Sequence, residues 1–203
     1  MTKPFLVVLG LRGTLLERLN IQETTSAIQR RPNLTFAKYN AWLRPGILHT
    51  LEKLSQVSDL AIWSATPHRN TVPLVSMAFP NIDFKFVWHR EHTTTDNIKR
   101  LLPADDTRNR FSVIKDLNKI YEEMPQYSPE RTVMVDDTIF KTRCHSGNVI
   151  LLPTYDVNCV VREPAGVDES ALNTQAAEEL YRFIKEELIP VKDVRDLLPK
   201  RLL

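Results

Sequence analysis

The sequence predicts an α/β protein in which helices pack on a central, mostly parallel sheet. Strand-like and helix-like segments alternate along the chain, which is the pattern of a parallel sheet built from β-α-β units. Residues 5–9 form a short apolar run, as expected for a strand that is covered on both faces. With 203 residues, the chain is about the size of one domain and can bury a sizeable core.

The remaining elements are predicted from apolar spacing and from breaker residues. An Arg-Pro-Gly sequence ends at Gly46, and an apolar stripe at helical spacing follows it, so a helix is expected to begin there. The segment 90–110 is polar without a clear period and is predicted to be a surface insertion. Further strands are expected at 60–64, 84–89, 132–135 and 149–152, and further helices at 70–79, 114–124 and 176–188, the last stopped by Pro190.

Composition narrows the class of protein. Hydrophobic residues make up 42% and charged residues 26%, which is ordinary for a globular chain and argues against both disorder and a membrane span. Two cysteines are too few for a disulfide framework, so we expect an intracellular, reducing compartment. No secretory signal or transit peptide is recognisable, although an uncleaved mitochondrial signal stays possible. The net charge of +2 is mild for a dedicated nucleic-acid-binding domain.

Several predicted strands end in polar side chains. Thr14 follows the first strand closely, Ser64 ends the second, and Asp136 and Asp137 end the fourth, while Lys115 lies just before a predicted helix. The carboxyl ends of parallel strands meet at one edge of the sheet, which is where ligands of open α/β sheets bind. These side chains therefore mark the candidate site.

Over residues 4–157 the chain resembles the CTD-phosphatase branch of the haloacid dehalogenase superfamily, which includes the NLI-interacting-factor-like proteins and a mitochondrial Tim translocase subunit. The resemblance implies an HAD-like Rossmannoid three-layer fold at 1–160, with a flap at about 15–40 and the insertion at about 90–110. A C-terminal helical extension at 161–203 would pack on this domain or project from it. The matching segments, in chain order, are Val7–Leu15, Leu43–Gly46, Ala61–Thr66, Val113–Leu117, Val133–Thr138 and Leu152–Asp156.

The family would make this chain a Mg²⁺-dependent phosphoprotein phosphatase. In the family's motifs the serine corresponding to Ser64 and the lysine corresponding to Lys115 contact phosphate, and the acidic pair corresponding to Asp136 and Asp137 binds the metal. The family's nucleophilic aspartate, however, falls on Gly10, and its acid/base aspartate falls on Arg12.

These two departures predict that catalysis is lost. Covalent phosphoryl transfer needs a carboxylate at the first position, and Gly10 has no side chain that could attack phosphorus. In a protease, removal of the nucleophile lowers turnover about a million-fold, which corresponds to roughly 8 kcal/mol of barrier. We expect the Mg²⁺ site to be lost as well, with Arg12 paired to Asp136 or Asp137 in place of the ion.

The sequence therefore favours a pseudophosphatase that serves as a structural or assembly subunit of a protein complex, without a small-molecule substrate. A mitochondrial assembly is favoured slightly over other compartments, and a ribonucleoprotein such as a ribosomal particle is the other setting considered. The alternatives are a phosphate- or phosphopeptide-binding module that uses Arg12, Ser64 and Lys115, an active phosphatase, or a regulator of an active paralogue.

Basic residues in the flap, insertion and tail could contact RNA or a partner protein, although such residues usually form a solvated surface. For several candidates a plain structural role is also open: Asp136-Asp137 as a turn and helix cap, Lys115 as a solvated lysine, and the three tryptophans as core residues. Zinc is not expected, because His89, His92, Cys144 and His145 do not follow a ligand spacing. The basic candidates are Arg30, Arg31, Lys99, Arg100, Arg108, Arg110, Lys200 and Arg201.

Overall fold

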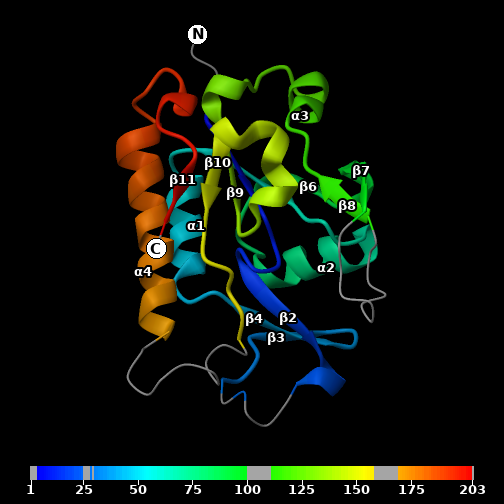
Figure 1. Ribbon diagram of the computed structural model, residues 1–203. Helices are drawn as coiled ribbons and strands as arrows, with labels where there is room; N and C mark the ends of the chain where they lie inside the picture. The colour runs from blue at the N-terminus through cyan, green and yellow to red at the C-terminus, as the bar shows by residue number, and fades with distance from the viewer. Residues whose placement is uncertain (1–3, 25–27, 29, 100–110, 158–168, 203) are drawn as a thin grey trace.

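A computed structural model places six strands in one central sheet with helices on both faces (Figure 1). The strand order is β11-β10-β9-β1-β5-β6, and each neighbouring pair is parallel. The structure describes residues 4–24, 28, 30–99, 111–157 and 169–202. Within these ranges, no helix is both long and apolar enough to cross a membrane. The predicted α/β class is confirmed.

The central strand β1 (Leu6–Leu9) lies between β5 (Asp59–Trp63) and β9 (Thr132–Asp136). Since these three strands are parallel and adjacent, the residues at their carboxyl ends come together at one edge of the sheet. The outer strands are β6 (Phe84–Trp88) on one side and β10 (Val149–Leu151) with β11 (Lys200–Arg201) on the other.

The two faces of the sheet have separate hydrophobic clusters. Val7 and Leu9 of β1 belong to one cluster, and Leu6 and Val8 belong to the other, as expected from the alternation of side chains along a strand. The first cluster includes residues of α1 (Ile47–Ser55), α2 (His68–Ala78) and α4 (Glu169–Phe183), whereas α3 (Asn118–Glu123) contributes to the second. All three tryptophans are core residues, as predicted: Trp42, Trp63 and Trp88.

The segment after β1 leaves the main sheet and forms a small sheet of its own. Its strands are β2 (Leu16–Asn20), β3 (Leu34–Phe36) and β4 (Tyr39–Leu43), with a 3₁₀ turn, η1 (Ile21–Glu23), after β2. They pair antiparallel in the order β2-β4-β3. Leu34 and Phe36 pack against the first core cluster. The region expected to be a flap is therefore a small sheet fixed to the body of the protein.

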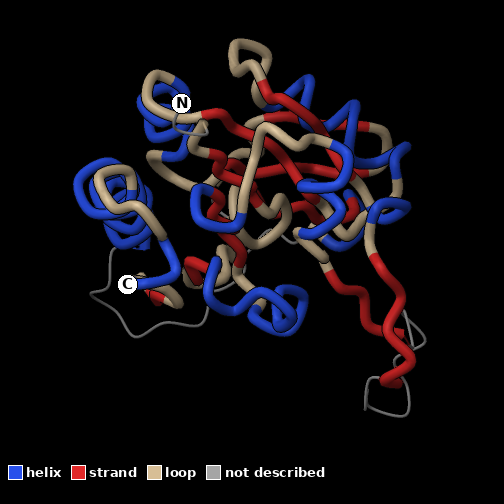
Figure 2. Tube along the Cα trace, turned by 90° about the horizontal axis from the view of Figure 1, so that it is seen from above, coloured by secondary structure: helices blue, strands red, loops and turns tan. Residues whose placement is uncertain are grey.

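The insertion is more regular than the sequence indicated. A 3₁₀ turn, η2 (Arg90–His92), leads into β7 (Thr94–Lys99), which pairs antiparallel with β8 (Phe111–Ile114). Figure 2 shows this pair extending away from the body. The predicted helix at 114–124 begins later, at Asn118, because Ile114 still belongs to β8. β-Branched Thr94 and Thr95 favour a strand even where no apolar alternation marks one.

The described part of the C-terminal segment is packed on the domain. After α4 the chain continues through a π-helical turn, η6 (Ile184–Leu188), which ends before Pro190, and a 3₁₀ turn, η7 (Val194–Asp196). Thr50 Oγ1 donates a hydrogen bond to the Ala177 carbonyl at 2.9 Å, which joins α1 to α4. Gly46, with a φ of 77°, permits this close contact, since a Cβ there would lie 3.3 Å from Thr174 Cα. β11 then completes the sheet beside β10.

Leu180 tests whether α4 belongs to the core. Its side chain is fully buried, so Leu180→Ala is expected to lower the free energy of unfolding by about 2–5 kcal/mol in urea titrations. Leu172→Ala is the matched control, because Leu172 lies on the same helix and is 52% exposed. Its effect should stay within about 0.5 kcal/mol. Equal, small effects at both positions would contradict this packing.

Candidate functional site

A cavity of about 420 Å³ lies at the carboxyl ends of β1, β5 and β9. It brings together the polar residues predicted for the site: Arg12, Ser64, Lys115, Asp136 and Asp137. Thr14 and Gly10 lie directly against this group, because a Cβ placed on Gly10 would meet Thr14 and Asp136. The cavity is lined further by Leu11, Gly13, Glu17, Ala65, Thr66, Arg90, Lys141, Thr154 and Asp156.

Gly10 has no room for a side chain in the present packing. Its backbone N–H donates to the Val135 carbonyl at 2.7 Å, which continues the β1–β9 pairing. A Cβ at this position would lie 2.6 Å from Thr14 Oγ1 and 2.9 Å from Asp136 Oδ2. Both distances are shorter than non-bonded contacts allow, so Thr14 and Asp136 fill the space that a side chain would need.

Lys115 and Asp136 form an ion pair that is almost completely buried. The Lys115 ammonium donates to Asp136 Oδ2, and the two side chains are only 2% and 1% exposed. Asp136 Oδ1 accepts the Thr138 N–H at 3.0 Å and lies 3.8 Å from Lys141 Nζ. Burial alone would raise the pKa of Asp136, but the ammonium groups of Lys115 and Lys141 hold it below its usual value. Lys115 is therefore not the solvated lysine that remained open from the sequence.

Asp137 lies closer to the surface of the cavity than Asp136. Its Oδ2 accepts a hydrogen bond from Thr154 Oγ1 at 3.1 Å, and its Oδ1 lies 3.9 Å from Lys141 Nζ. Burial and the neighbouring Asp136 carboxylate raise the pKa of Asp137. The acidic pair thus contains one strongly paired carboxylate and one that is held less tightly.

The predicted ion pair between Arg12 and Asp136 or Asp137 is wrong. Arg12 Nε donates instead to Glu17 Oε1 at 2.7 Å, and the Arg12 side chain is 53% exposed. Burial raises the pKa of Glu17, although the Arg12 charge opposes this shift. The compact ammonium groups of Lys115 and Lys141 already surround Asp136, so the bulkier guanidinium is left at the entrance of the cavity.

The hydroxyl groups after β5 bond to one another. Ser64 Oγ and Thr66 Oγ1 are 2.8 Å apart, and Thr66 Oγ1 and Thr71 Oγ1 are 2.7 Å apart. Ser64 Oγ also accepts the Thr66 N–H at 3.1 Å. The chain of hydroxyls therefore stabilises the turn into α2.

Arg44 anchors the loop that follows β1. Its guanidinium is buried and donates from Nε to the Thr14 carbonyl at 2.6 Å and from Nη2 to the Gly13 carbonyl at 2.9 Å. The same Nη2 reaches the Pro153 carbonyl, and Nη1 donates to Asn173 Oδ1 of α4 at 2.7 Å. Burial lowers the pKa of Arg44 to about 10, so the group keeps its charge at neutral pH. The Arg-Pro-Gly motif thus fixes the site loop as well as the start of α1.

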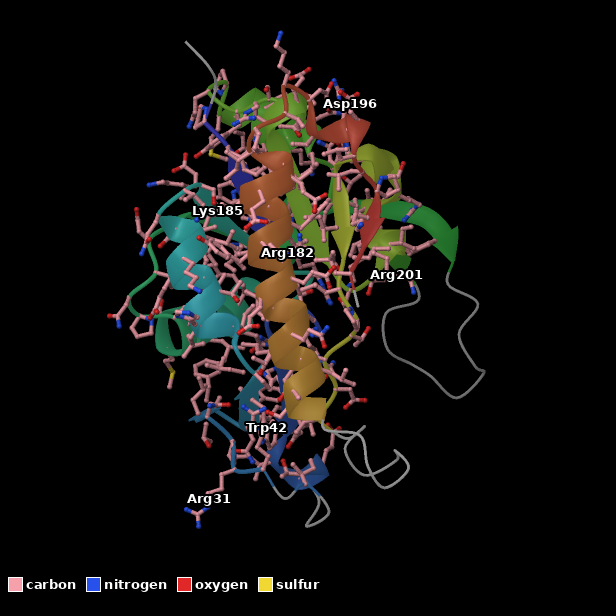
Figure 3. The ribbon with its side chains drawn as sticks, turned by 90° about the vertical axis from the view of Figure 1, so that its left-hand side faces the viewer. Arg31, Trp42, Arg182, Lys185, Asp196 and Arg201 are labelled. Carbon is pink, nitrogen blue, oxygen red and sulfur yellow. The ribbon has the colours of Figure 1, made fainter. Side chains whose placement is uncertain are left out.

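Among the suggested RNA or partner contacts, those in the described part of the chain do not form one surface. Arg30 has a role inside the fold, since its Nη1 donates to Tyr155 Oη at 3.0 Å. Arg31 projects from the end of the flap, far from Arg201 near the C-terminal end of the chain (Figure 3). Lys200 is exposed, and its Nζ lies 5.3 Å from the centroid of the Phe183 ring. The side chain of Lys99 and residues Arg100, Arg108 and Arg110 lie outside the described residues.

Sequence reasoning missed several residues of the cavity. Thr154 and Asp156 lie in the segment 152–156, which was recognised as similar to the family but was given no role. Lys141 lies in the 3₁₀ segment η4 (Ile139–Asn148), where no motif or period marks it. Glu17 follows the first motif and lies on β2. Its place in the cavity depends on the direction in which its side chain points from that strand, which the sequence does not show.

The family assignment rests on most of the chain. The sequence profile of the NLI interacting factor-like phosphatase family matches residues 5–195. The chain belongs to this family. The predicted resemblance and the HAD-like fold are therefore confirmed. A search of curated protein sequences finds no significant match.

Solved structures share this fold at low sequence identity. The chain resembles Fcp1, described as an essential RNA polymerase II CTD phosphatase, with a TM-score of 0.59 and 11% identity over 97% of this chain and 70% of that one. Fission yeast Fcp1 bound to beryllium fluoride matches with a TM-score of 0.53 and 15% sequence identity. The match covers 96% of this chain but only 53% of that one. A putative phosphoglycolate phosphatase from Lactobacillus delbrueckii subsp. bulgaricus matches with a TM-score of 0.53 and 15% sequence identity. That match covers 92% of this chain and 100% of the other.

The buried ion pair can be tested by a double-mutant cycle. Asp136→Asn leaves the Lys115 ammonium buried without its carboxylate, and Lys115→Met leaves the carboxylate without its nearest cation. Each change is expected to lower the free energy of unfolding by about 3–5 kcal/mol. The double variant should lose clearly less than the sum of the two. Urea titration measures the stability of the two single variants and the double variant, and Lys192→Met at an exposed lysine is the control. Strictly additive losses of stability would contradict a direct pair.

Proposed function

We propose that this chain is a catalytically inactive member of its family and acts as a structural or assembly subunit of a larger complex. The observation that carries the proposal is Gly10 at the position of the family's nucleophile, with Thr14 and Asp136 filling the adjacent space. A phosphoryl group cannot be transferred covalently to a residue without a nucleophilic atom. Gly10 also argues against an active phosphatase, which is the function that the family name suggests.

The proposal includes the loss of the family's Mg²⁺ ion. Magnesium prefers six oxygen ligands in octahedral geometry and is usually bound by one or two carboxylates with water and phosphate. Here both Asp136 oxygens are engaged by Lys115, Thr138 and Lys141, and Gly10 supplies no carboxylate. Two ammonium groups beside Asp136 would also repel a divalent cation. The residues at this position do not fit the ion.

The charges of the cavity favour the assembly role over phosphopeptide binding. The four basic residues that line it are matched by an equal number of acidic ones, so a phosphate dianion would meet no net positive charge. Lys115, the family's phosphate-binding lysine, is already paired with Asp136. The basic residues are Arg12, Arg90, Lys115 and Lys141, and the acidic ones are Glu17, Asp136, Asp137 and Asp156.

For the partner, we favour protein over RNA as the main contact. The net charge of +2 gives little long-range attraction to a polyanion. Arg31 and Arg201 are exposed but far apart, so they would serve as separate contacts rather than as one nucleic-acid groove (Figure 3). The translocase relative points to a mitochondrial protein assembly, and a ribonucleoprotein is the second setting that we propose.

The assembly role predicts a stable set of partners. The tagged chain should co-purify with the same proteins from native extracts before and after RNase treatment. The charge-reversal variant Arg31→Glu tests the flap as a contact, and Arg182→Glu on the outside of α4 is its matched control. Mass spectrometry reads out the bound proteins. Loss of all partners after RNase would make RNA the bridge, and recovery of the chain alone would contradict the assembly role.

A further inference from the structure

Three imidazole rings pack together at the carboxyl end of β6, outside the residues that line the cavity. The ring centroids of His89 and His92 are 4.3 Å apart, and those of His68 and His89 are 4.8 Å apart. The ring of His92 also stacks on Trp88, with centroids 5.0 Å apart and planes inclined by 6°. Trp88 belongs to the second core cluster, so the histidines are anchored to the interior of the fold.

This cluster contains the turn that leads from the main sheet into the projecting hairpin. Within η2, the His92 N–H donates to the His89 carbonyl at 2.9 Å, and the His89 N–H donates to His92 Nδ1 at 3.2 Å. Thr93 Oγ1 donates to the Arg90 carbonyl at 2.6 Å, and Lys119 Nζ donates to the His92 carbonyl at 3.0 Å. The path of the chain into β7 therefore depends on the bonds of this turn.

The bonds of the turn require a particular protonation state. His92 Nδ1 can accept the His89 N–H only while that nitrogen carries no proton. His89 Nδ1 faces the Glu91 carboxylate. A proton at His92 Nδ1 would remove this acceptor and leave a charged ring whose centroid is 4.3 Å from that of the His89 ring.

The surrounding charges act in both directions on His92. Burial and the neighbouring His89 lower the pKa of His92. The carboxylates of Glu91 and Glu123 oppose this shift, and the face of Trp88 would also favour a cation. Lys119 at the His92 carbonyl adds a further positive charge, and Arg90 lies within the turn. His68 approaches from α2 with its ring against His89.

We propose that the cluster of His68, His89 and His92 is an acid-sensitive joint that fixes the base of the β7–β8 hairpin at neutral pH and releases it in acid. A histidine whose pKa is lower in the closed turn than in the open one binds its proton more readily in the open turn. The closed turn is therefore fully stable above the usual histidine pKa of about 6.5 and loses stability as the pH falls below it. The joint goes beyond the proposed assembly role, because it concerns the hairpin rather than the degenerate phosphatase site.

Hydrogen exchange with mass spectrometry tests the joint in the full-length protein. Labelling at pH 7.5 and pH 5.5 is compared after correction for intrinsic exchange rates. Backbone amides of residues 89–95 and 113–114 should lose about tenfold in protection in acid, whereas β1, β5 and β9 should keep theirs. Equal protection of the hairpin base at the two pH values would overturn the proposal. A loss of protection spread evenly over all strands would overturn it too.

Two variants and a control separate the joint from general acid effects. His92→Phe keeps a ring on Trp88 but cannot take a proton, so the difference between the two pH values should disappear. His89→Gln removes the ring that packs against His92 and should reduce that difference, which keeps the test open if His92→Phe does not fold. His49→Gln, at an exposed histidine of α1, should leave it unchanged. An undiminished loss of protection in acid in His89→Gln would show that the two rings do not act together.

Discussion

The buried ion pair between Lys115 and Asp136 is the constraint on which the candidate site depends. It joins the carboxyl end of β9 to the segment that follows β8, and the Lys115 N–H reinforces the join by donating to the Lys141 carbonyl at 2.8 Å. A charge pair so deeply buried is stable only while both partners are present. Because Asp136 and Lys115 are paired with each other, each is the nearest opposite charge of the other inside the cavity. Asp136 also lies in the space that a side chain at Gly10 would need.

Arg44 extends this arrangement to the rest of the fold. Its guanidinium binds carbonyls on both sides of the cavity, at Gly13 and Pro153, and holds Asn173 on α4. Buried carbonyls of irregular segments need such donors, because they have no partner within a strand or helix. The consequence is a rigid frame around the cavity. In the assembly role that we propose, this frame would preserve the surfaces that the protein offers to its partners.

Much of the fold and of the site followed from local sequence patterns. The apolar run of β1, the Arg-Pro-Gly helix start and the acidic pair after β9 are recognisable because a few adjacent residues define each of them. The partner of Arg12 was not predictable in this way. It depends on the fold, which places Lys115 and Lys141 beside Asp136 and leaves Glu17 as the carboxylate next to Arg12. The pairing of β7 with β8 was missed because β7 is mostly polar and the segment that contains it shows no apolar period.

The central claim is that this chain no longer hydrolyses phosphoesters, and phosphate release from a phosphoserine peptide in millimolar Mg²⁺ tests it most directly. The purified protein and its Asp136→Asn variant are assayed side by side, so that a contaminating phosphatase is recognised by equal rates in both. The account predicts no release above the buffer blank for either protein. Turnover by the unaltered chain that is abolished in Asp136→Asn would contradict it, because a working metal-dependent site would then exist despite Gly10 and Lys115.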